Sequence, residues 1–338
     1  MKKPTLVDVG QEAGVSAITV SRALRQPEKV SDSMRAKVNA AVKKLGYVPD
    51  VAAAALASKR SNIIGMVVPS FSNNVFADVL AGAYDAIEGT GFTIQIGNVN
   101  YSALTEETLL PNLLNLRPVG LIVAGVDQTR RSKELLKMAA CPVVQVMDTD
   151  SDPLDMIVGF SHSDAAATAV GHMIDMGFRR IGFLGARMDP RSQKRMAGYR
   201  YALEQRGLFD PALQVTTQSS SSVSVGGHLL ADLLAIAPDC DAIFCNNDDI
   251  AVGAAFECQR RNLAIPRDMG ICGFNDLGTA AEMHPRLSSV FTPRFEIGRR
   301  AVEMAVRAIN GPLPAEDRIV DLGVELRVRA STNLANVS

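Results

Sequence analysis

Two side chains near the amino terminus, Ile18 and Arg22, have the chemistry needed to read the edges of DNA bases. A methyl-bearing side chain can contact the methyl group of thymine, and an arginine can donate two hydrogen bonds to guanine. In a helix capped by Ser16 these two residues share one face, because they lie four positions apart. We expect Val20 and Leu24 on the opposite, buried face. The outward face would also carry Ala17, Ser21 and Arg25.

Three predicted helices would position these side chains. Thr5 and Asp8 have the spacing of a capping box at the start of a first helix, and Gly14 can end it in a left-handed conformation. A third helix is expected from Ser31 to just before Gly46. The inward residues of the first and third helices would be Leu6, Val9, Ala13, Met34, Val38, Val42 and Leu45. A helix–turn–helix places its second helix in the DNA major groove. The alternative is a small bundle whose outward residues are only solvated.

Charge is distributed unevenly along the 338 residues. Residues 1–60 hold eleven Lys and Arg against five Asp and Glu, whereas the remainder hold 24 against 31. A basic N-terminal segment followed by an acidic remainder is typical of a nucleic-acid-binding module joined to a domain with another function. The sequence has no apolar run long enough to span a membrane, and its first residues lack the apolar core of a signal peptide. We therefore expect a cytoplasmic protein without membrane contact.

The sequence shows no arrangement typical of catalysis. Glycine fingerprints for nucleotides and the short motifs of hydrolases and metalloproteases are absent, so we expect no enzyme activity and no cofactor. Asp248 and Asp249 are adjacent, which favours the N-terminus of a helix over an acid–base pair. Histidines and cysteines lack metal-ligand spacing, so no metal site is expected. The cysteines predicted to be buried, reduced thiols are Cys141, Cys240, Cys245, Cys258 and Cys272.

From Asn62 onward, strand-like runs alternate with amphipathic stretches, which predicts a parallel, doubly wound α/β fold. The predicted strands include Ile63–Val68, Phe92–Ile96, Gly120–Val123, Val143–Val146, Ile181–Leu184, Ala242–Cys245 and Gly270–Gly273. Amphipathic helices are expected between the strands, for example at 75–89, 164–176, 195–206, 226–236, 249–261 and 295–309. These units are too many for one typical sheet, so we expect two lobes. Ligands in such folds bind at the carboxyl ends of the strands, which predicts a cleft between the lobes.

Residues 48–60 form a predicted linker between the two parts. Pro49 ends the helical domain, and residues 51–58 have high helix propensity but are too few to form a stable helix alone. Such a segment can fold on binding, and Leu56, next to a basic pair, could insert between base steps in the minor groove. The alternative is a plain tether with Leu56 packed on the following domain.

These features resemble the LacI/GalR family of bacterial repressors, over essentially the whole chain. The family pattern T-L-x-D-V-A-x-x-A-G-V-S-x-x-T-V-S-R is matched over Thr5–Arg22 except at Gly10, where the family has alanine. Residues 45–49 resemble the stretch that leads into the family's hinge helix. The leucine that the family inserts into the minor groove and its two flanking alanines correspond to Leu56, Ala53 and Ala57.

The second part of the chain also resembles this family. Ile64–Pro69 resembles the family's first strand, and Arg195–Tyr199 resembles R-x-x-G-Y/W, which supplies an effector-binding arginine. Gly273–Asp276 resembles G-F/Y-D-D, with Asn275 in place of an acidic residue that often binds sugar hydroxyls. This replacement argues against a simple neutral sugar or a purine as effector. Within the family the gluconate-type repressors are the most similar, on the stretches Pro69–Ala77, Leu184–Asp189 and Asn246–Gln259.

The resemblance implies an effector site, and its residue types favour a sugar acid. Arg187, Arg191 and Arg195 cluster near one strand end, and a bidentate arginine suits a carboxylate. Asn275 removes a charge that would repel such a ligand. The further candidates, for hydroxyl groups and for an apolar wall, are Asn73, Asn247, Asp148 and Phe76. The alternative is that the arginines are solvated and the other residues are ordinary caps or core.

The predicted fold is an all-α helix–turn–helix domain (1–47), a hinge helix or linker (48–60), and a two-lobed α/β effector domain similar to periplasmic binding proteins (61–338). The residues predicted to contact DNA are Thr5, Leu6, Ser16, Ala17, Ile18, Thr19, Ser21, Arg22, Arg25, Ser31, Ala53, Leu56 and Ala57.

The resemblance implies a homodimer on a pseudo-palindromic operator, and the chain has no leucine-heptad tail that would favour a tetramer. The predicted function is repression of sugar-acid genes, controlled by gluconate or a ketogluconate. The alternatives are a neutral sugar or a purine as effector, or a solute-binding protein that does not bind DNA. A gel shift at low salt separates the last alternative from the others.

Overall fold

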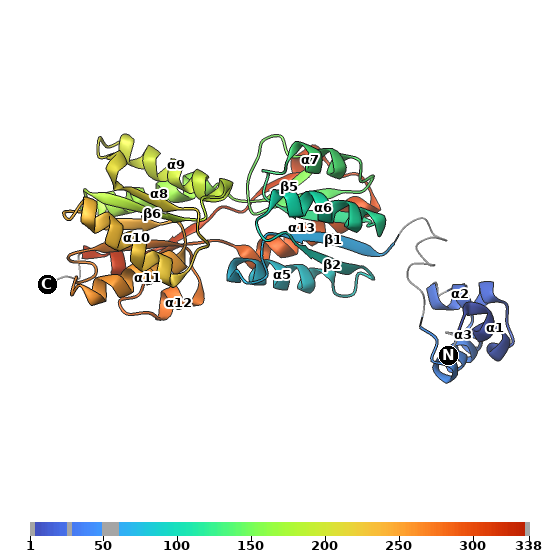
Figure 1. The fold of residues 1–338 in the computed structure, drawn as a ribbon. Helices are drawn as coiled ribbons and strands as arrows, with labels where there is room; N and C mark the ends of the chain where they lie inside the picture. Colours follow the sequence, from blue (N-terminus) through green and yellow to red (C-terminus); the bar gives the residue numbers. More distant parts are fainter. Residues whose placement is uncertain (1–3, 26–28, 49–60, 335–338) are drawn as a thin grey trace. The chain divides into compact units, whose positions relative to one another are not determined.

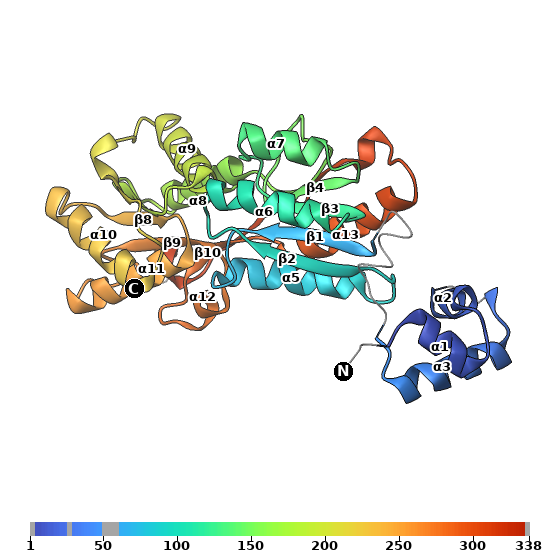
Figure 2. The same ribbon diagram turned by 45° about the vertical axis from the view of Figure 1, so that its right-hand side comes forward.

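The computed structural model describes residues 4–25, 29–48 and 61–334, and the chain divides into two compact units, Met1–Ser61 and Asn62–Ser338 (Figures 1 and 2). The predicted linker lies largely outside the described residues, so its boundaries and its hinge helix stay predictions. Among the described residues, no helix combines the length and the apolar character needed to cross a membrane.

The first unit is a three-helix bundle of α1 (Leu6–Ala13), α2 (Ala17–Arg25) and α3 (Asp32–Leu45). The capping box is present, because Thr5 N donates to Asp8 Oδ2 at 2.7 Å and Thr5 Oγ1 accepts from Asp8 N. Gly14 ends α1 at a φ of 69°. The bundle closes over a small apolar core whose buried members are Val9, Val20, Ala23, Val38, Ala41 and Tyr47. This packing leaves the outer face of α2 in solvent.

The first lobe of the second unit is a six-stranded parallel sheet in the order β11-β5-β4-β3-β1-β2. Its strands are β1 (Ile63–Val68), β2 (Thr93–Asn98), β3 (Gly120–Ala124), β4 (Val143–Val146), β5 (Met156–Gly159) and β11 (Ile319–Asp321). Its helices are α5 (Asn74–Ile87), α6 (Ala103–Asn115), α7 (Arg130–Lys137) and α13 (Arg294–Asn310). In β1, Met66 packs toward α5 and α13, whereas Val67 packs toward α6 and α7, as the period of two in a strand requires.

The second lobe repeats this architecture with the strand order β12-β10-β9-β8-β6-β7. Its strands are β6 (Ile181–Ala186), β7 (Gln214–Thr217), β8 (Ala242–Cys245), β9 (Gly270–Asn275), β10 (Ser288–Phe291) and β12 (Glu325–Arg327). Its helices are α8 (His162–Asp175), α9 (Pro190–Glu204), α10 (Val223–Ile236), α11 (Asp248–Arg260) and α12 (Gly278–Glu282). The short edge strand β12 runs antiparallel to β10, which departs from the purely parallel pattern that the sequence predicts.

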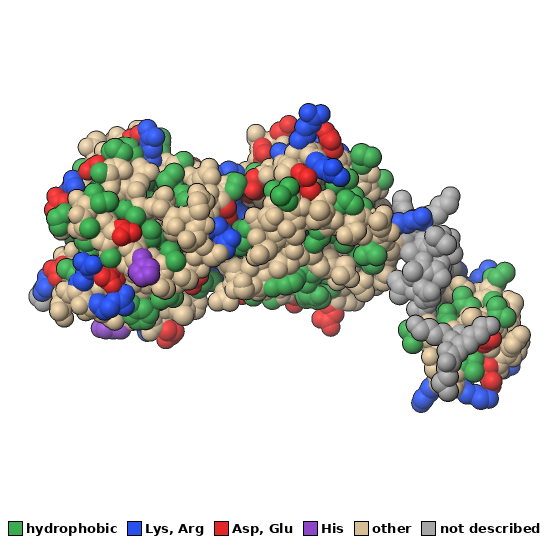
Figure 3. Space-filling view, in the orientation of Figure 1, with side chains coloured by type: hydrophobic (Ala, Val, Ile, Leu, Met, Phe, Trp, Pro, Cys, Tyr) green, Lys and Arg blue, Asp and Glu red, His purple; other side chains and the backbone are tan. Residues whose placement is uncertain are grey.

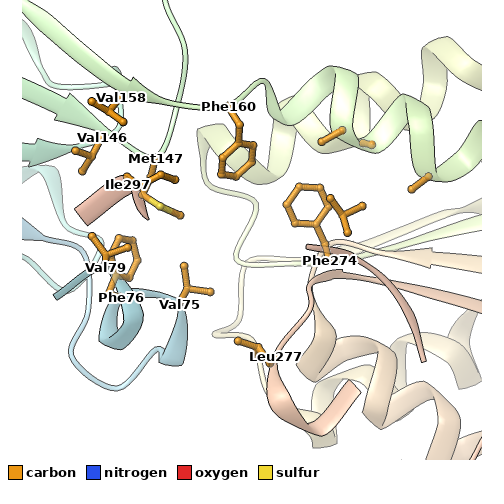
Figure 4. Packing of buried hydrophobic residues seen from close by; sticks show 14 of the residues in the cluster. Val75, Phe76, Val79, Val146, Met147, Val158, Phe160, Phe274, Leu277 and Ile297 are labelled. Carbon is orange, nitrogen blue, oxygen red and sulfur yellow. The ribbon is translucent and has the colours of Figure 1, made fainter. Parts of the chain in front are cut away.

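The chain passes three times between the lobes: from β5 to α8, from β10 to α13, and from β11 to β12. One apolar cluster continues from lobe to lobe beside these crossings. Figure 4 shows Phe160, at the first crossing, next to Phe274 at the end of β9, and their ring centroids are 6.3 Å apart. Met147 and Phe76 belong to the same cluster and come from the first lobe. The crossings and this cluster fix the carboxyl ends of both sheets around one cleft.

Candidate functional site

A cavity lies between the lobes at the carboxyl ends of their strands. It is lined by Asn73, Val75, Phe76, Tyr101, Met147, Ala186, Arg187, Asp189, Arg191, Ser192, Arg195, Ser221, Asn247, Asp249, Asn275 and Leu277. Seven of the eight residues that the sequence proposed for the effector are in this lining. The cavity itself has a volume of about 70 Å³. It adjoins a chamber of about 500 Å³ that shares Tyr101, Arg187, Asp189 and Arg191 with it, and the volume of this chamber is in the range usual for small-molecule sites. Figure 3 shows Lys and Arg side chains in the groove between the lobes.

Arg195, on α9, is held by three partners. Its Nε donates to His162 Nδ1 at 3.2 Å, its Nη1 donates to the Asn246 carbonyl at 2.5 Å, and its guanidinium lies 3.9 Å from the Phe274 ring centroid. Burial lowers the pKa of Arg195 to about 10, so the group remains charged at neutral pH. A cation fixed in this way on the cavity wall can bind an anionic group of a ligand.

His162 links this arginine to the first lobe. Burial and the neighbouring charge of Arg195 hold the pKa of His162 well below 6.5, so its ring is neutral. Since Nδ1 accepts from Arg195, the proton is on Nε2, which donates to the Met147 carbonyl at 2.9 Å. Met147 directly follows β4 of the first lobe. Arg195 therefore reaches across the lobe boundary through one imidazole.

Arg191 forms an ion pair with Asp189 at 3.2 Å in the first turn of α9. Burial disfavours the charged form of both groups. For Arg191, the negative charges of Asp189 and Asp127 outweigh this effect and raise its pKa. For Asp189, the charge of Arg191 and the hydrogen bond from the Ser192 N–H lower its pKa. The Nη1 atom of Arg191 is buried and has no hydrogen-bond partner in the described structure. This nitrogen is a donor available to a ligand.

Asn275, the last residue of β9, provides an acceptor in the same lining. Its φ is 107°, in a region that side-chain-bearing residues rarely adopt, and it is 3% exposed. The buried Oδ1 atom has no hydrogen-bond partner in the part of the chain described. A buried acceptor without a partner costs free energy, which a ligand hydroxyl can recover by donating to it.

The opposite wall comes from the first lobe. Asn73 caps α5 by accepting from Val75 N at 3.0 Å, and its Nδ2 donates to the Tyr101 hydroxyl at 2.7 Å. The guanidinium of Arg187 lies 4.1 Å from the Tyr101 ring centroid and donates to Ser220 Oγ at 2.6 Å. Arg187 of the second lobe and Tyr101 of the first thus bridge the two lobes. They line both the cavity and the adjoining chamber. Phe76 is 3% exposed and contributes the apolar part of this wall.

Three carboxylates near the cavity differ in their roles. Asp148, a predicted effector contact, is not in the lining, and both its oxygens accept from Lys194 Nζ at 2.7 Å. Asp248 lies behind the cavity at the start of α11, where it accepts from Ser289 Oγ and Leu277 N, and burial raises its pKa to about 7. Asp249 lines the cavity, and burial raises its pKa as well.

Some lining residues escape the sequence interpretation. Asp189 stands between Arg187 and Arg191 in sequence, so the arginine cluster itself was a signal that could have indicated it. Tyr101 follows β2 in a loop with a φ of 56°, and no motif marks it. Asn247 was expected to bind hydroxyls, and its Oδ1 already accepts from Ile250 N at 3.2 Å and Ser221 Oγ at 2.9 Å. Among the described residues, no group of His, Cys, Asp or Glu could hold a metal ion.

The predicted DNA-contact residues gather around α2. Ile18 is 73% exposed, Arg22 is exposed, and Ala17 and Ser21 are partly exposed. Ser16 Oγ accepts from Thr19 N at 3.1 Å and so caps the helix. At the other helix ends, Thr5 and Ser31 are exposed and Leu6 is partly buried. The side chain of Arg25 and the residues Ala53, Leu56 and Ala57 lie outside the described part of the chain.

Comparisons with known proteins match both units. Residues 5–50 match the family "Bacterial regulatory proteins, lacI family", and residues 170–332 match the "Periplasmic binding protein-like domain". The chain is 40% identical over 330 residues to the HTH-type transcriptional regulator GntR of Pseudomonas aeruginosa, covering 98% of this chain and 96% of that protein. It is 36% identical over 323 residues to the HTH-type transcriptional regulator IdnR of Escherichia coli, covering 95% and 96%.

A solved structure agrees with these matches. The lac repressor dimer bound to operator and the anti-inducer ONPF superposes with a TM-score of 0.86 at 26% identity, covering 98% of this chain and 99% of that one. The GntR and IdnR relatives confirm the resemblance to gluconate-type regulators, and the helix–turn–helix and two-lobed α/β folds are those predicted. The chain belongs to the LacI family of bacterial regulatory proteins.

Proposed function

We propose that this chain represses transcription by binding operator DNA through α2, and that a sugar acid such as gluconate or a ketogluconate controls this binding from the cavity between the lobes. The proposal includes a homodimer on a pseudo-palindromic site, as the dimeric lac repressor structure supports by analogy. It also includes a cytoplasmic location and the absence of enzyme activity, in agreement with relatives that are transcriptional regulators.

The observation that carries the effector proposal is the buried donor and acceptor left without partners in the described cavity. Arg191 Nη1 can donate to a carboxylate, and Asn275 Oδ1 can accept from a hydroxyl. The lining holds three arginines against two carboxylates, Asp189 and Asp249, so one further negative charge would balance it. A linear polyol with a terminal carboxylate supplies both groups. A neutral sugar or a purine would leave the excess positive charge unbalanced.

The proposed DNA contacts rest on the exposure of α2. Ile18 is a large apolar side chain that is mostly exposed to solvent, and it is not part of the buried core of the bundle. Contact with a thymine methyl would explain why Ile18 is exposed, and Arg22 on the same face can bind guanine. The minor-groove insertion of Leu56 between Ala53 and Ala57 remains part of the proposal. An effector that releases DNA must bind the DNA-free form more tightly than the DNA-bound form.

The effector is tested by calorimetric titration of the full-length protein with D-gluconate and with D-sorbitol, which lacks the carboxylate. Gluconate should bind at least about tenfold more tightly than sorbitol. Asn275→Asp places a second carboxylate in the cavity with that of the ligand, and at a separation of about 8 Å and an effective dielectric constant of about 20 this repulsion costs about 2 kcal/mol, or roughly thirtyfold in affinity. Asn112→Asp, the same change on the exposed side of α6, should leave the affinity unchanged. Tight binding of a neutral sugar without binding of any aldonate contradicts the proposal.

The DNA-binding part is tested separately by selection of sites from a random DNA pool at low salt. A pseudo-palindromic site should be enriched, and gluconate should change the affinity of the protein for it. A protein that binds gluconate but enriches no site would be a solute-binding protein, which is the alternative function.

A further inference from the structure

One buried guanidinium connects the effector cavity to helix α5. Arg294 is the first residue of α13, at the point where the chain returns from the second lobe to the first. Its Nη1 donates to the Asn275 carbonyl and to Thr292 Oγ1, the latter at 3.0 Å. Its Nε donates to Asp78 Oδ2 on α5 at 2.9 Å, and Nη2 lies 2.8 Å from the same oxygen. This side chain therefore joins α5, the crossing and the end of β9.

The position of Arg294 is electrostatically unfavourable without these contacts. The side chain is only 8% exposed, and it stands at the N-terminus of a helix, where the backbone dipole disfavours a cation. Its anionic partner Asp78 is half exposed, so solvent weakens the compensation. A leucine or methionine would fill a buried site at lower cost. An arginine at this position therefore needs another explanation, and the contacts that only its guanidinium makes are those with Asn275 and Asp78.

The contact with Asn275 controls a residue of the cavity. Asn275 holds a φ of 107°, and such a backbone persists only when its surroundings fix it. Arg294 binds the carbonyl of this residue, while the Oδ1 atom faces the cavity lining without a partner among the described residues. The next two amides are also fixed, Asp276 N by Ser289 Oγ at 3.0 Å and Leu277 N by Asp248. Loss of the guanidinium would leave the Asn275 carbonyl, at the start of this segment, without the hydrogen bond that holds it.

The contact with Asp78 reaches α5, a helix that packs closely against α13. Gly82 of α5 and Gly298 of α13 lie directly against the backbone carbonyls of the facing helix, with no space for a Cβ atom. The two helices are therefore one closely packed pair. The first turn of α5 also supplies Asn73 and Phe76 to the cavity.

We propose that Arg294 is the positioning residue of the effector cavity: it aims the Asn275 amide at the ligand and transmits occupancy of the cavity to α5 through Asp78. The role of the ligand in this inference rests on the proposed function, since the probe is a sugar acid. The positioning of the 275–277 segment is independent of the proposed function, because it is a property of the protein without ligand.

The test uses the full-length protein with Arg294→Lys and with Asp78→Asn. Arg294→Lys keeps the charge but replaces the planar guanidinium, which donates from three separate nitrogens, by a single nitrogen that cannot reproduce this fork toward Asn275 and Asp78. Arg300→Gln is the matched control, because Arg300 is a half-exposed arginine on the same helix, paired with Glu296. D-gluconate affinity is measured by calorimetry, and affinity for the selected DNA site is measured with and without D-gluconate. Hydrogen–deuterium exchange of the 275–277 segment is measured without ligand.

Arg294→Lys should weaken gluconate binding by about tenfold or more and should speed exchange of the 275–277 amides, while Arg300→Gln does neither. Asp78→Asn should reduce the effect of gluconate on DNA affinity by more than it reduces gluconate affinity itself. Unchanged exchange in Arg294→Lys overturns the inference, whatever the ligand. Wild-type coupling in Asp78→Asn overturns the transmission to α5. If the wild-type protein binds no sugar acid, the proposed function fails, and the exchange measurement still decides the positioning role.

Discussion

His162 shows how a single residue can join two lobes without carrying charge. Its ring accepts from Arg195 on one nitrogen and donates to the Met147 carbonyl with the other, so both ring nitrogens are used in the neutral form. A protonated ring could not accept from Arg195 and would place two cations in contact. This arrangement makes the lobe boundary sensitive to acid.

The sign of this pH dependence follows from the lowered pKa of His162. Above about pH 6.5 the ring is neutral in both the folded and the unfolded chain, and below it only the unfolded chain takes up the proton. The free energy of unfolding should therefore fall as the pH falls below about 6.5, by up to about 1.4 kcal/mol per pH unit.

Urea unfolding between about pH 7.5 and 5.5 checks this expectation on the wild type and on His162→Asn, which does not titrate. The wild type should lose about 1 kcal/mol more than the variant below pH 6.5. The exposed His228 provides the control variant His228→Asn, which should follow the wild type. Parallel curves for the wild type and His162→Asn would show that the ring is not held neutral.

Residue types and spacing predicted much of the cavity before its geometry was known. Arg191 and Arg195 are four positions apart on α9 and so lie on one face, which is a local property that a sequence displays. Asp148 illustrates the limit, because the strand end that it follows predicted proximity to the cavity. Its ion pair with Lys194, 46 residues later in the chain, is a tertiary contact that no local pattern contains.

At the scale of elements, the predicted strands correspond to the edge strand β2 and to the inner strands β1, β3, β4, β6, β8 and β9, whereas β5, β7, β10, β11 and β12 were not among them. β1, β4 and β8 are continuous apolar runs because helices cover both their faces. The edge strands β11 and β12 have three residues each and are largely exposed, so they lack that pattern. Helix α6 was not among the helices named as examples, and Pro111 lies inside it.

The close packing of α5 against α13 gives a prediction at this scale. Gly298→Ala would drive a Cβ atom into the carbonyl of Val79, and we expect a loss of about 2–3 kcal/mol in the free energy of unfolding. At Gly171 of α8 an added Cβ atom would meet nothing within 4 Å, so Gly171→Ala should add about 0.5–1 kcal/mol through helix propensity. Chemical denaturation of both variants measures the difference. A Gly298→Ala variant as stable as the wild type would mean that α5 and α13 can separate at little cost.

At the scale of the whole molecule, the basic and acidic parts of the chain correspond to its two compact units. DNA recognition and effector binding should therefore be separable by mutation. Arg22→Ala should weaken binding to the selected DNA site by about 1–3 kcal/mol, and the gluconate affinity of the DNA-free protein should stay unchanged. Arg35→Ala, on α3 and paired with the exposed Asp32, is the control. Filter binding measures the affinity for DNA, and calorimetry measures the affinity for gluconate. An equal loss of DNA affinity in Arg35→Ala would indicate that Arg22 acts through general positive charge and not through base recognition.

The three crossings between the lobes also determine when the protein can fold during its synthesis. Each lobe is assembled from separated stretches of chain, and both sheets receive their last strand from residues 319–327. A ribosome that has made about 290 residues has produced most of both sheets but not α13, β11 or β12. The nascent chain at that stage lacks Arg294 and the backing of α5, so its half-built cleft cannot yet select a ligand. Neither lobe can be excised as one contiguous fragment, and the two halves must mature together near the end of translation.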